Sequence, residues 1–156
     1  MSGPEQRLAE LGLTLPAVPT PAGAYVPAVR SGDLVWTAGQ IPLVNGEVAV
    51  TGKVGADVTA RRAKELARVC ALNALAAVRA EIGDLSLVRR VVKVVGFVAS
   101  APDFVDQPGV VNGASELLGD VFGDAGRHAR SAVGVAVLPK DVPVEVELVV
   151  EVGPAA

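Results

Sequence analysis

The chain has 156 residues, of which 51% are hydrophobic and 20% are charged, so it can fill one domain-sized core and is not disordered throughout. The formal net charge of −3 argues against nucleic acid as the main partner. Cys70 is the single cysteine, which excludes an internal disulfide and favours a cytoplasmic location.

The N-terminal part of the chain is rich in proline. The pattern predicts a short helix over Pro4–Leu11 that stops at Gly12, followed by an extended connector. The longest uncharged run, Leu11–Val29, holds four prolines, which excludes a membrane-spanning helix there. We expect a single domain, with residues 1–22 as this N-terminal segment and residues 23–152 as the core.

Two hairpins are predicted next. Ser31-Gly32-Asp33 separates two runs of strand-like composition, Tyr25–Arg30 and Leu34–Thr37. Asn45-Gly46 separates Leu43-Val44 from Glu47–Val50, and Asn-Gly favours a tight hairpin because both central residues need a positive φ.

Helices and strands alternate in the rest of the chain. Thr59–Ile82 is the clearest helix, with Thr59 as its N-cap and Gly83 at its end. The Val-rich segment Leu87–Ser100 predicts a long strand. The remaining predicted elements are a helix over Val110–Phe122 and strands over Ser131–Leu138 and Pro143–Val152.

This element order predicts an α+β fold with about six strands in the sheet and two helices on one face. The other face of the sheet then has no cover. Because the chain contains 30 valines, we expect that face to be apolar enough to need a partner.

A few polar residues stand where they could bind a ligand. Arg130 precedes a strand of small apolar residues, and a guanidinium there can bind a carboxylate through two parallel hydrogen bonds. Glu145 and Glu147 share one face of the last strand, where a carboxylate can act as a general acid or base. The turn at Gly39 could expose N–H groups to an anion. Composition and spacing alone favour a structural or solvated role for each of them.

Three further polar side chains are weaker candidates. Tyr25 is the only tyrosine and could contact a ligand, or it could be an ordinary strand aromatic. Asn112 falls on the polar side of the second long helix, and His128 has no Ser/His/Asp arrangement around it in the sequence. One His and one Cys cannot build a zinc site with the usual nitrogen and sulfur ligands.

Two segments of the chain resemble the RidA/YjgF family. Val35-Trp36-Thr37-Ala38-Gly39-Gln40-Ile41-Pro42 is similar to the family segment V-x-T-S-G-Q-I-P. Residues 129–141 are similar to the signature A-R-S-C-V-E-V-A-x-L-P-K-D, and Val144-Glu145-Val146-Glu147 follows at the family's spacing. Gly23-Ala24-Tyr25 resembles the G-P-Y start, and the likeness extends to Val152 in the same element order.

The resemblance implies a chorismate-mutase-like subunit with a mixed sheet, assembled as a homotrimer with ligand clefts between subunits. It implies hydrolysis of reactive enamine and imine acids, such as 2-aminoacrylate and 2-iminobutanoate, to 2-keto acids and ammonia, with no metal or organic cofactor. In that activity Arg130 would hold the substrate carboxylate. Glu145 would position the attacking water or protonate the substrate through that water. The residues that would line the cleft are Tyr25, Gly39, Asn112 and Ala132.

The sequence departs from the family pattern at three positions. The usual residues Ser, Cys and Glu are replaced by Ala38, Ala132 and Gly134. The cleft therefore has fewer polar groups, and the sequence leaves the identity of the substrate open. Two other functions stay open. One is a module that binds a small carboxylate such as a 2-keto acid without catalysis, and the other is an endoribonuclease, against which the acidic charge and the lack of a His pair weigh.

The spacing of Arg130 and Glu145 leads to a further expectation. If the last two strands formed a simple hairpin, Arg130 would face Glu151 and would lie six residues, or about 20 Å, from Glu145 along the strands. No small substrate spans that distance. Either these strands are not hairpin neighbours, or the two residues reach one site from different subunits.

Overall fold

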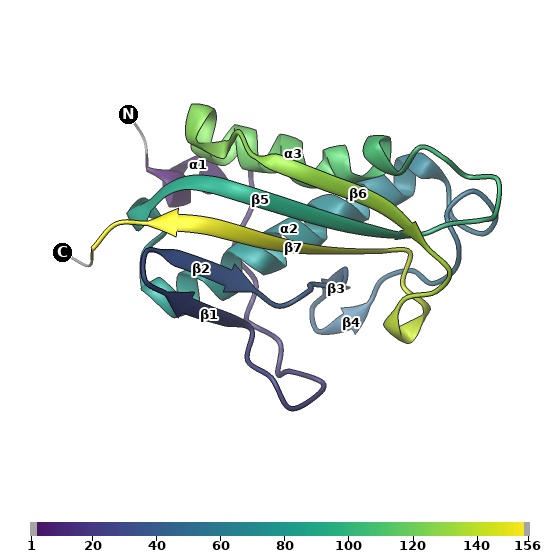
Figure 1. Cartoon of the computed structure of the whole chain (residues 1–156), viewed down its shortest axis with the longest axis horizontal. Helices are drawn as coiled ribbons and strands as arrows, with labels where there is room; N and C mark the ends of the chain where they lie inside the picture. Colours follow the sequence, from purple (N-terminus) through teal and green to yellow (C-terminus); the bar gives the residue numbers. More distant parts are fainter. Residues whose placement is uncertain (1–2, 155–156) are drawn as a thin grey trace.

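The computed structural model describes residues 3–154 of the chain. Its main sheet is built from β1 (Ala28–Ser31), β2 (Leu34–Thr37), β5 (Val88–Ala99), β6 (Ala129–Val135) and β7 (Val144–Val152). Their order in the sheet is β1-β2-β7-β5-β6 (Figure 1). The sheet is mixed, because β6 runs parallel to β5 whereas the other neighbouring strands are antiparallel.

Two long helices, α2 (Ala60–Ile82) and α3 (Gln107–Phe122), cover one face of the sheet (Figure 1). This confirms the α+β arrangement predicted from the sequence. The remaining helical segments are short: α1 (Pro4–Glu10) and the 3-10 turns η1 (Leu85–Leu87), η2 (Gly123–Gly126) and η3 (Pro139–Asp141).

The ends of the long helices follow from their caps. The Thr59 side chain accepts a hydrogen bond from the N–H of Arg62, and Gly83 ends α2 with a φ of 89°. Helix α3 begins at Gln107, three residues before the predicted start, because the Asp106 carboxylate caps the N–H of Gly109.

The hydrophobic core lies between the sheet and the two long helices. One side of α2 is apolar and buried, and it packs with buried valines of β5 and with residues of β7. Small side chains dominate this core, which lets the helices lie close to the strands. Its central members are Ala63, Leu66, Cys70, Ala74, Val78, Val94, Val98, Val146 and Leu148.

The second predicted hairpin does not join the main sheet. It forms a separate ribbon of β3 (Leu43–Val44) and β4 (Glu47–Val48), so the main sheet has five strands where about six were expected. Asn45 and Gly46 have the positive φ values that the turn requires. The buried Asn73 amide of α2 donates to the carbonyls of Ile41 and Leu43 and thereby ties the ribbon to the helices.

The last two strands are not hairpin neighbours, because β5 lies between β6 and β7. Helix α3 connects β5 to β6 as a crossover, which brings β6 beside β5 in the parallel sense. After β6 the chain passes through η3 to reach β7 on the other side of β5.

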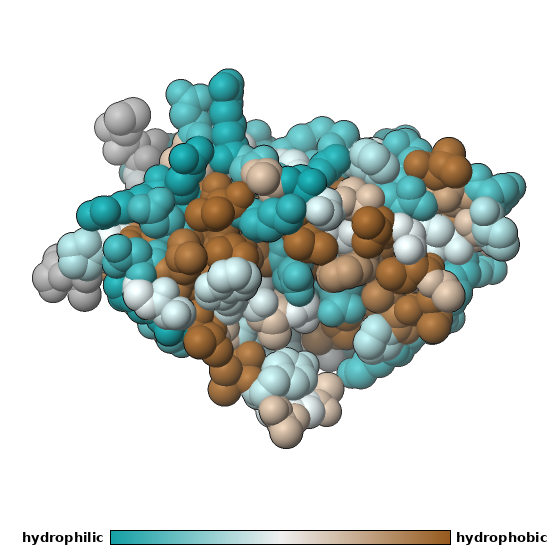
Figure 2. Space-filling model, viewed as in Figure 1, coloured by the Kyte–Doolittle hydropathy of each residue, from teal (hydrophilic) through white to brown (hydrophobic). Residues whose placement is uncertain are grey.

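The second face of the sheet has no helix over it in residues 3–154 (Figure 1). Large apolar side chains are exposed there, including those of Val29, Trp36 and Val133. Figure 2 shows this face, with apolar patches spread between polar side chains. We refer to it below as the open face.

Candidate functional site

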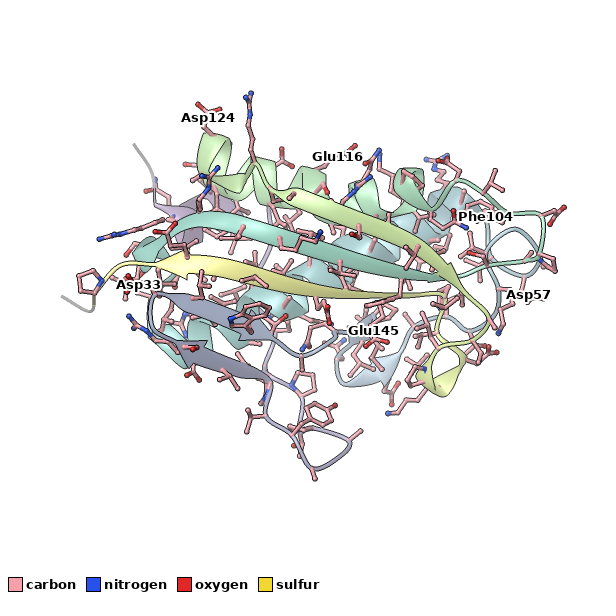
Figure 3. The ribbon with its side chains drawn as sticks, in the orientation of Figure 1. Asp33, Asp57, Phe104, Glu116, Asp124 and Glu145 are labelled. Carbon is pink, nitrogen blue, oxygen red and sulfur yellow. The ribbon has the colours of Figure 1, made fainter. Side chains whose placement is uncertain are left out.

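A pocket of about 150 Å³ opens beside the first residues of β7, and three of the predicted site residues line it. Tyr25 comes from the N-terminal connector, Gly39 from the turn after β2, and Glu145 from β7. Figure 3 shows Glu145 between β7 and the β3–β4 ribbon. Most of the other lining residues are apolar, namely Pro19, Pro21, Ala22, Pro27, Ile41, Leu43 and Pro139, and the polar ones are Thr20, Gln40 and Lys140.

Backbone pairing brings Gly39 against Glu145. The N–H of Gln40 donates to the carbonyl of Val146 at 2.8 Å, and the N–H of Val146 donates back at 3.0 Å. The turn therefore lies next to the strand that carries the carboxylate. A methyl group at Gly39 would overlap the Glu145 carboxyl group, so any larger residue here would displace that carboxyl group from its position in the pocket.

Glu145 is a half-buried carboxylate that makes no hydrogen bond or salt bridge within residues 3–154. Burial raises the pKa of Glu145, and the charge of nearby Glu147 raises it further. A carboxyl group whose pKa is moved toward neutrality can accept a proton and return it within one reaction cycle.

Lys140 is the cation that lines this pocket, and reasoning from the sequence assigned no functional role to it. Its backbone has a φ of 56°, in the left-handed region that non-glycine residues rarely adopt. The next residue, Asp141, is held by the Lys53 ammonium group and by the N–H of Gly52. These contacts fix the backbone of Lys140 at the rim of the pocket.

Cys70 belongs to the hydrophobic core rather than to the pocket. It is fully buried in α2, and its thiol contacts the carbonyl of Val144 at 3.7 Å. Burial raises the pKa of the Cys70 thiol well above its usual range, and the charge of Glu145 adds to the effect. The thiol therefore stays protonated and is not a nucleophile.

The other predicted residues gather at a second place, where β6 meets α3. Arg130 pairs with Val94 of β5, whose side chain is buried under the helices, so Arg130 also faces the helices. Its Nη1 donates to Asn112 Oδ1 at 2.7 Å and to Ser115 Oγ at 3.2 Å, and its Nη2 donates to the carbonyl of Pro108 at 3.3 Å. Ala132 lies two residues further along the same face of β6.

This network leaves part of the Arg130 guanidinium available. A guanidinium has five N–H donors, and three are used by Asn112, Ser115 and Pro108. Nε donates to no acceptor in residues 3–154 and Nη2 donates to one, and these two nitrogens share one edge of the group. Such an edge can bind both oxygens of a carboxylate. Arg130 has no carboxylate partner in the part of the chain that the structure describes.

Arg130 and Glu145 do not meet within one chain. Arg130 is level with Val94 and Leu148, whereas Glu145 is level with Phe97. Three residues along the strands and two strand spacings across them separate the two Cα atoms by roughly 14 Å. In addition, the Arg130 side chain lies on the helix side of the sheet and the Glu145 side chain lies on the open face, so the sheet separates them.

Reasoning from the sequence missed Ser115 and ranked His128 only as a weak candidate. His128 Nε2 lies 2.9 Å from Ser115 Oγ, and His128 Nδ1 lies 2.6 Å from the carbonyl oxygen of Gly126. The signal was present as two spacings. Asn112 and Ser115 are one helical turn apart on α3. His128 directly precedes β6 and lies two residues before Arg130, which places both side chains on one side of the extended chain.

Neither a membrane helix nor a metal cluster is found in residues 3–154. No helix there is long and apolar enough to cross a bilayer. No group of three His, Cys, Asp or Glu side chains in the same residues is placed to hold a metal ion.

Comparisons with known proteins identify the family. Residues 5–152 match the profile of the family described as "YjgF/chorismate mutase-like, putative endoribonuclease". Protein TCP17 of Trypanosoma cruzi is 46% identical over 145 residues, which cover 92% of this chain and 91% of that protein. The 2-iminobutanoate/2-iminopropanoate deaminase of Escherichia coli (strain K12) is 37% identical over 131 residues, which cover 84% of this chain and 89% of the enzyme. The crystal structure of Atu1372 from Agrobacterium tumefaciens, a protein of unknown function, superposes with a TM-score of 0.90 at 50% identity and covers 96% of this chain and 93% of that chain. Sequence and fold thus agree, and the chain belongs to the RidA/YjgF family.

Proposed function

We propose that this protein hydrolyses reactive 2-imino acids to 2-keto acids and ammonia, in a site completed by two copies of the chain. The observation that carries the proposal is the division of the polar groups. Glu145 lies in an apolar pocket without a partner, and Arg130 has a free edge on the opposite face of the same sheet. Lys140 lines the Glu145 pocket, but an ammonium group cannot bind both oxygens of a carboxylate through two parallel hydrogen bonds as Arg130 can.

A second copy can bring the halves together. Strand β6 is an edge strand of the sheet, so Arg130 lies at the margin of the molecule. The open face exposes Val29, Trp36 and Val133, which supports packing between copies. A ring of three copies, as the family resemblance implies, would bury those faces and place Arg130 of one copy beside the pocket of the next.

The chemistry requires a bound carboxylate, a placed water molecule and a mobile proton. Arg130 would hold the carboxylate of the substrate through Nε–H and Nη2–H. Water then adds to the carbon of the C=N group, and its proton passes to the Glu145 carboxylate while the C=N π electrons move to nitrogen. Glu145 returns the proton to the amine nitrogen and becomes a carboxylate again. The C–N bond then breaks while an oxygen lone pair forms the C=O bond, and the hydroxyl proton passes through the Glu145 carboxylate to the departing ammonia. A protonated 2-imino acid and one water thereby give a 2-keto acid and one ammonium ion.

No nucleophilic side chain is needed, because a protonated imine carbon is already electrophilic. Proton transfer by a positioned carboxyl group contributes about 10²–10⁴-fold, and positioning of the water and the substrate adds to it. The apolar wall formed by Pro21, Ile41 and Leu43 would take the side chain of the substrate. The name of the Escherichia coli relative, a 2-iminobutanoate/2-iminopropanoate deaminase, supports the same reaction class.

The word endoribonuclease in the family description suggests another activity, which the site supports less well. Cleavage of RNA without a metal commonly relies on an acid and a base that flank one phosphate. His128 is engaged by Ser115 and Gly126 on the helix side of the sheet, whereas Glu145 lies on the other side. The chain carries a formal net charge of −3, which does not attract a polyanion.

The test is to form the imine in place and measure its hydrolysis. A dehydratase acting on serine or threonine supplies the 2-imino acid, and the release of 2-keto acid is followed with and without this protein. We expect a catalytic amount of the parent protein to accelerate release, and Arg130→Ala and Glu145→Gln to remove most of the acceleration. Absence of acceleration with intact binding of a 2-keto acid would support the binding module instead.

A further inference from the structure

We propose that Ser115 and His128 are positioning residues, which orient Arg130 so that its free edge faces the substrate carboxylate. The inference rests on the proposed role of Arg130 and adds two residues to it. Neither side chain touches the pocket around Glu145. Both lie in the hydrogen-bonded network on the helix side of β6.

The network is directional. A carbonyl oxygen can only accept, so His128 Nδ1 donates to Gly126, 2.6 Å away. In the neutral ring Nε2 is then an acceptor, and the Ser115 hydroxyl group donates a hydrogen bond to it over 2.9 Å. The Ser115 oxygen keeps its lone pairs for Arg130 Nη1, which donates to it over 3.2 Å. His128 thus fixes which way the serine hydroxyl points.

The acceptors on α3 restrict the orientation of the Arg130 guanidinium. Pro108, Asn112 and Ser115 are spaced by four and three residues on α3, so they form one stripe of acceptors that faces β6. With both Nη1 hydrogens used, rotation of the guanidinium is restricted. The edge that carries Nε is then already oriented for a ligand, so the Arg130 side chain need not become more ordered when the ligand binds. Loss of Ser115 would leave one Nη1 hydrogen unpaired and allow the group to turn.

The surroundings favour this role over a purely structural one. Ser115, His128 and Arg130 are all partly exposed, so the hydrogen bonds among them contribute little to the stability of the fold. The core around α3 consists instead of apolar residues such as Val111, Ala114 and Leu118. Replacing Ser115 should therefore leave the fold intact while it changes how Arg130 binds an anion.

The experiment measures binding of 2-oxobutanoate by calorimetry and turnover of the imine generated in place, for the full chain and its variants. Because a hydrogen bond to a charged group is lost, we expect Ser115→Ala to raise both the dissociation constant and KM by about tenfold, with kcat changed by less than about twofold. His128→Ala should give a smaller increase in the same direction. Ser115→Thr, which keeps the hydroxyl group, should restore binding, and Glu116→Gln on an exposed position of α3 serves as the control.

Two further measurements separate the possible outcomes. Pyruvamide lacks the carboxylate, so its weak binding should not respond to Ser115→Ala, whereas a general disturbance of the site would weaken it too. If Arg130→Ala itself leaves 2-oxobutanoate binding unchanged, the proposed role of Arg130 fails. If Arg130→Ala abolishes binding but Ser115→Ala and His128→Ala bind like the parent, only the positioning role is overturned. Should Ser115→Ala fail to fold, His128→Ala decides between the same results, because His128 lies outside α3.

Discussion

Replacement of Gly39 by alanine tests the geometry around Glu145 most simply. The added methyl carbon would overlap Glu145 Oε1 and would lie 2.9 Å from Glu145 Cδ, whereas carbon atoms make their best contact at about 3.5–4.0 Å. The carboxyl carbon must therefore move by at least roughly 0.6–1.1 Å, and a misplacement of about 1 Å can cost 10²-fold in rate. We expect kcat/KM to fall by about 10–100-fold for Gly39→Ala, since the carboxylate is displaced while the fold is kept.

A matched glycine and a double variant make this prediction specific. Gly119 lies on α3, and a methyl group added there would have nothing within 4 Å, so Gly119→Ala should keep full activity and slightly raise stability. In a Glu145→Ala background the obstacle is gone, and Gly39→Ala should have no further effect on turnover. Keto-acid release is the assay for all four proteins. Parent-like turnover by Gly39→Ala, or independent losses that multiply in the double variant, would refute the role assigned to this contact.

Three more predictions concern the charged groups. Arg130→Lys should lose most activity with the fold intact, because an ammonium group cannot form two parallel bonds to a carboxylate; parent-like turnover in the imine assay would remove Arg130 from the site. Glu147→Gln should lower the pKa of Glu145 by removing a like charge, so the acidic limb of the pH–rate profile should move to lower pH, and an unmoved limb would contradict that. Because the pKa of Glu145 is raised in the folded state, its ionised form lowers the free energy of unfolding once the pH rises through that pKa. Glu145→Gln should therefore raise Tm relative to the parent at about pH 8 but not at about pH 4, and thermal unfolding at both pH values measures this.

Local signals in the sequence predicted most of the elements. Thr59 and Gly83 bound α2 because a cap and a terminating glycine act on their own neighbours. Asn45-Gly46 forms its turn for the same reason. What these signals do not encode is which strand lies next to which. The placement of β5 between β6 and β7 depends on how α3 packs on the sheet, and the residues of β6 and β7 alone do not indicate it.

The candidate site divides in the same way. The family resemblance named Arg130, Glu145, Tyr25, Gly39, Asn112 and Ala132, but the sequence could not say that they fall into two groups on opposite faces. That division follows from the strand order and register, which set Arg130 level with Val94 and Glu145 level with Phe97. Lys140 and Ser115 were missed and His128 was ranked low, because their relevance comes from contacts made across the fold rather than from neighbours in the chain.

The central claim is that Arg130 of one copy and Glu145 of another form one site, and mixing two inactive variants tests it most directly. Arg130→Ala and Glu145→Ala chains are unfolded together at equal amounts, refolded, and assayed for imine hydrolysis. In a three-membered ring with random mixing, about one site in four joins an intact Glu145 to an intact Arg130, so about a quarter of the parent activity should return. Activity that stays at the level of the separate variants, or full activity of the parent protein at a monomeric mass, would contradict the shared site.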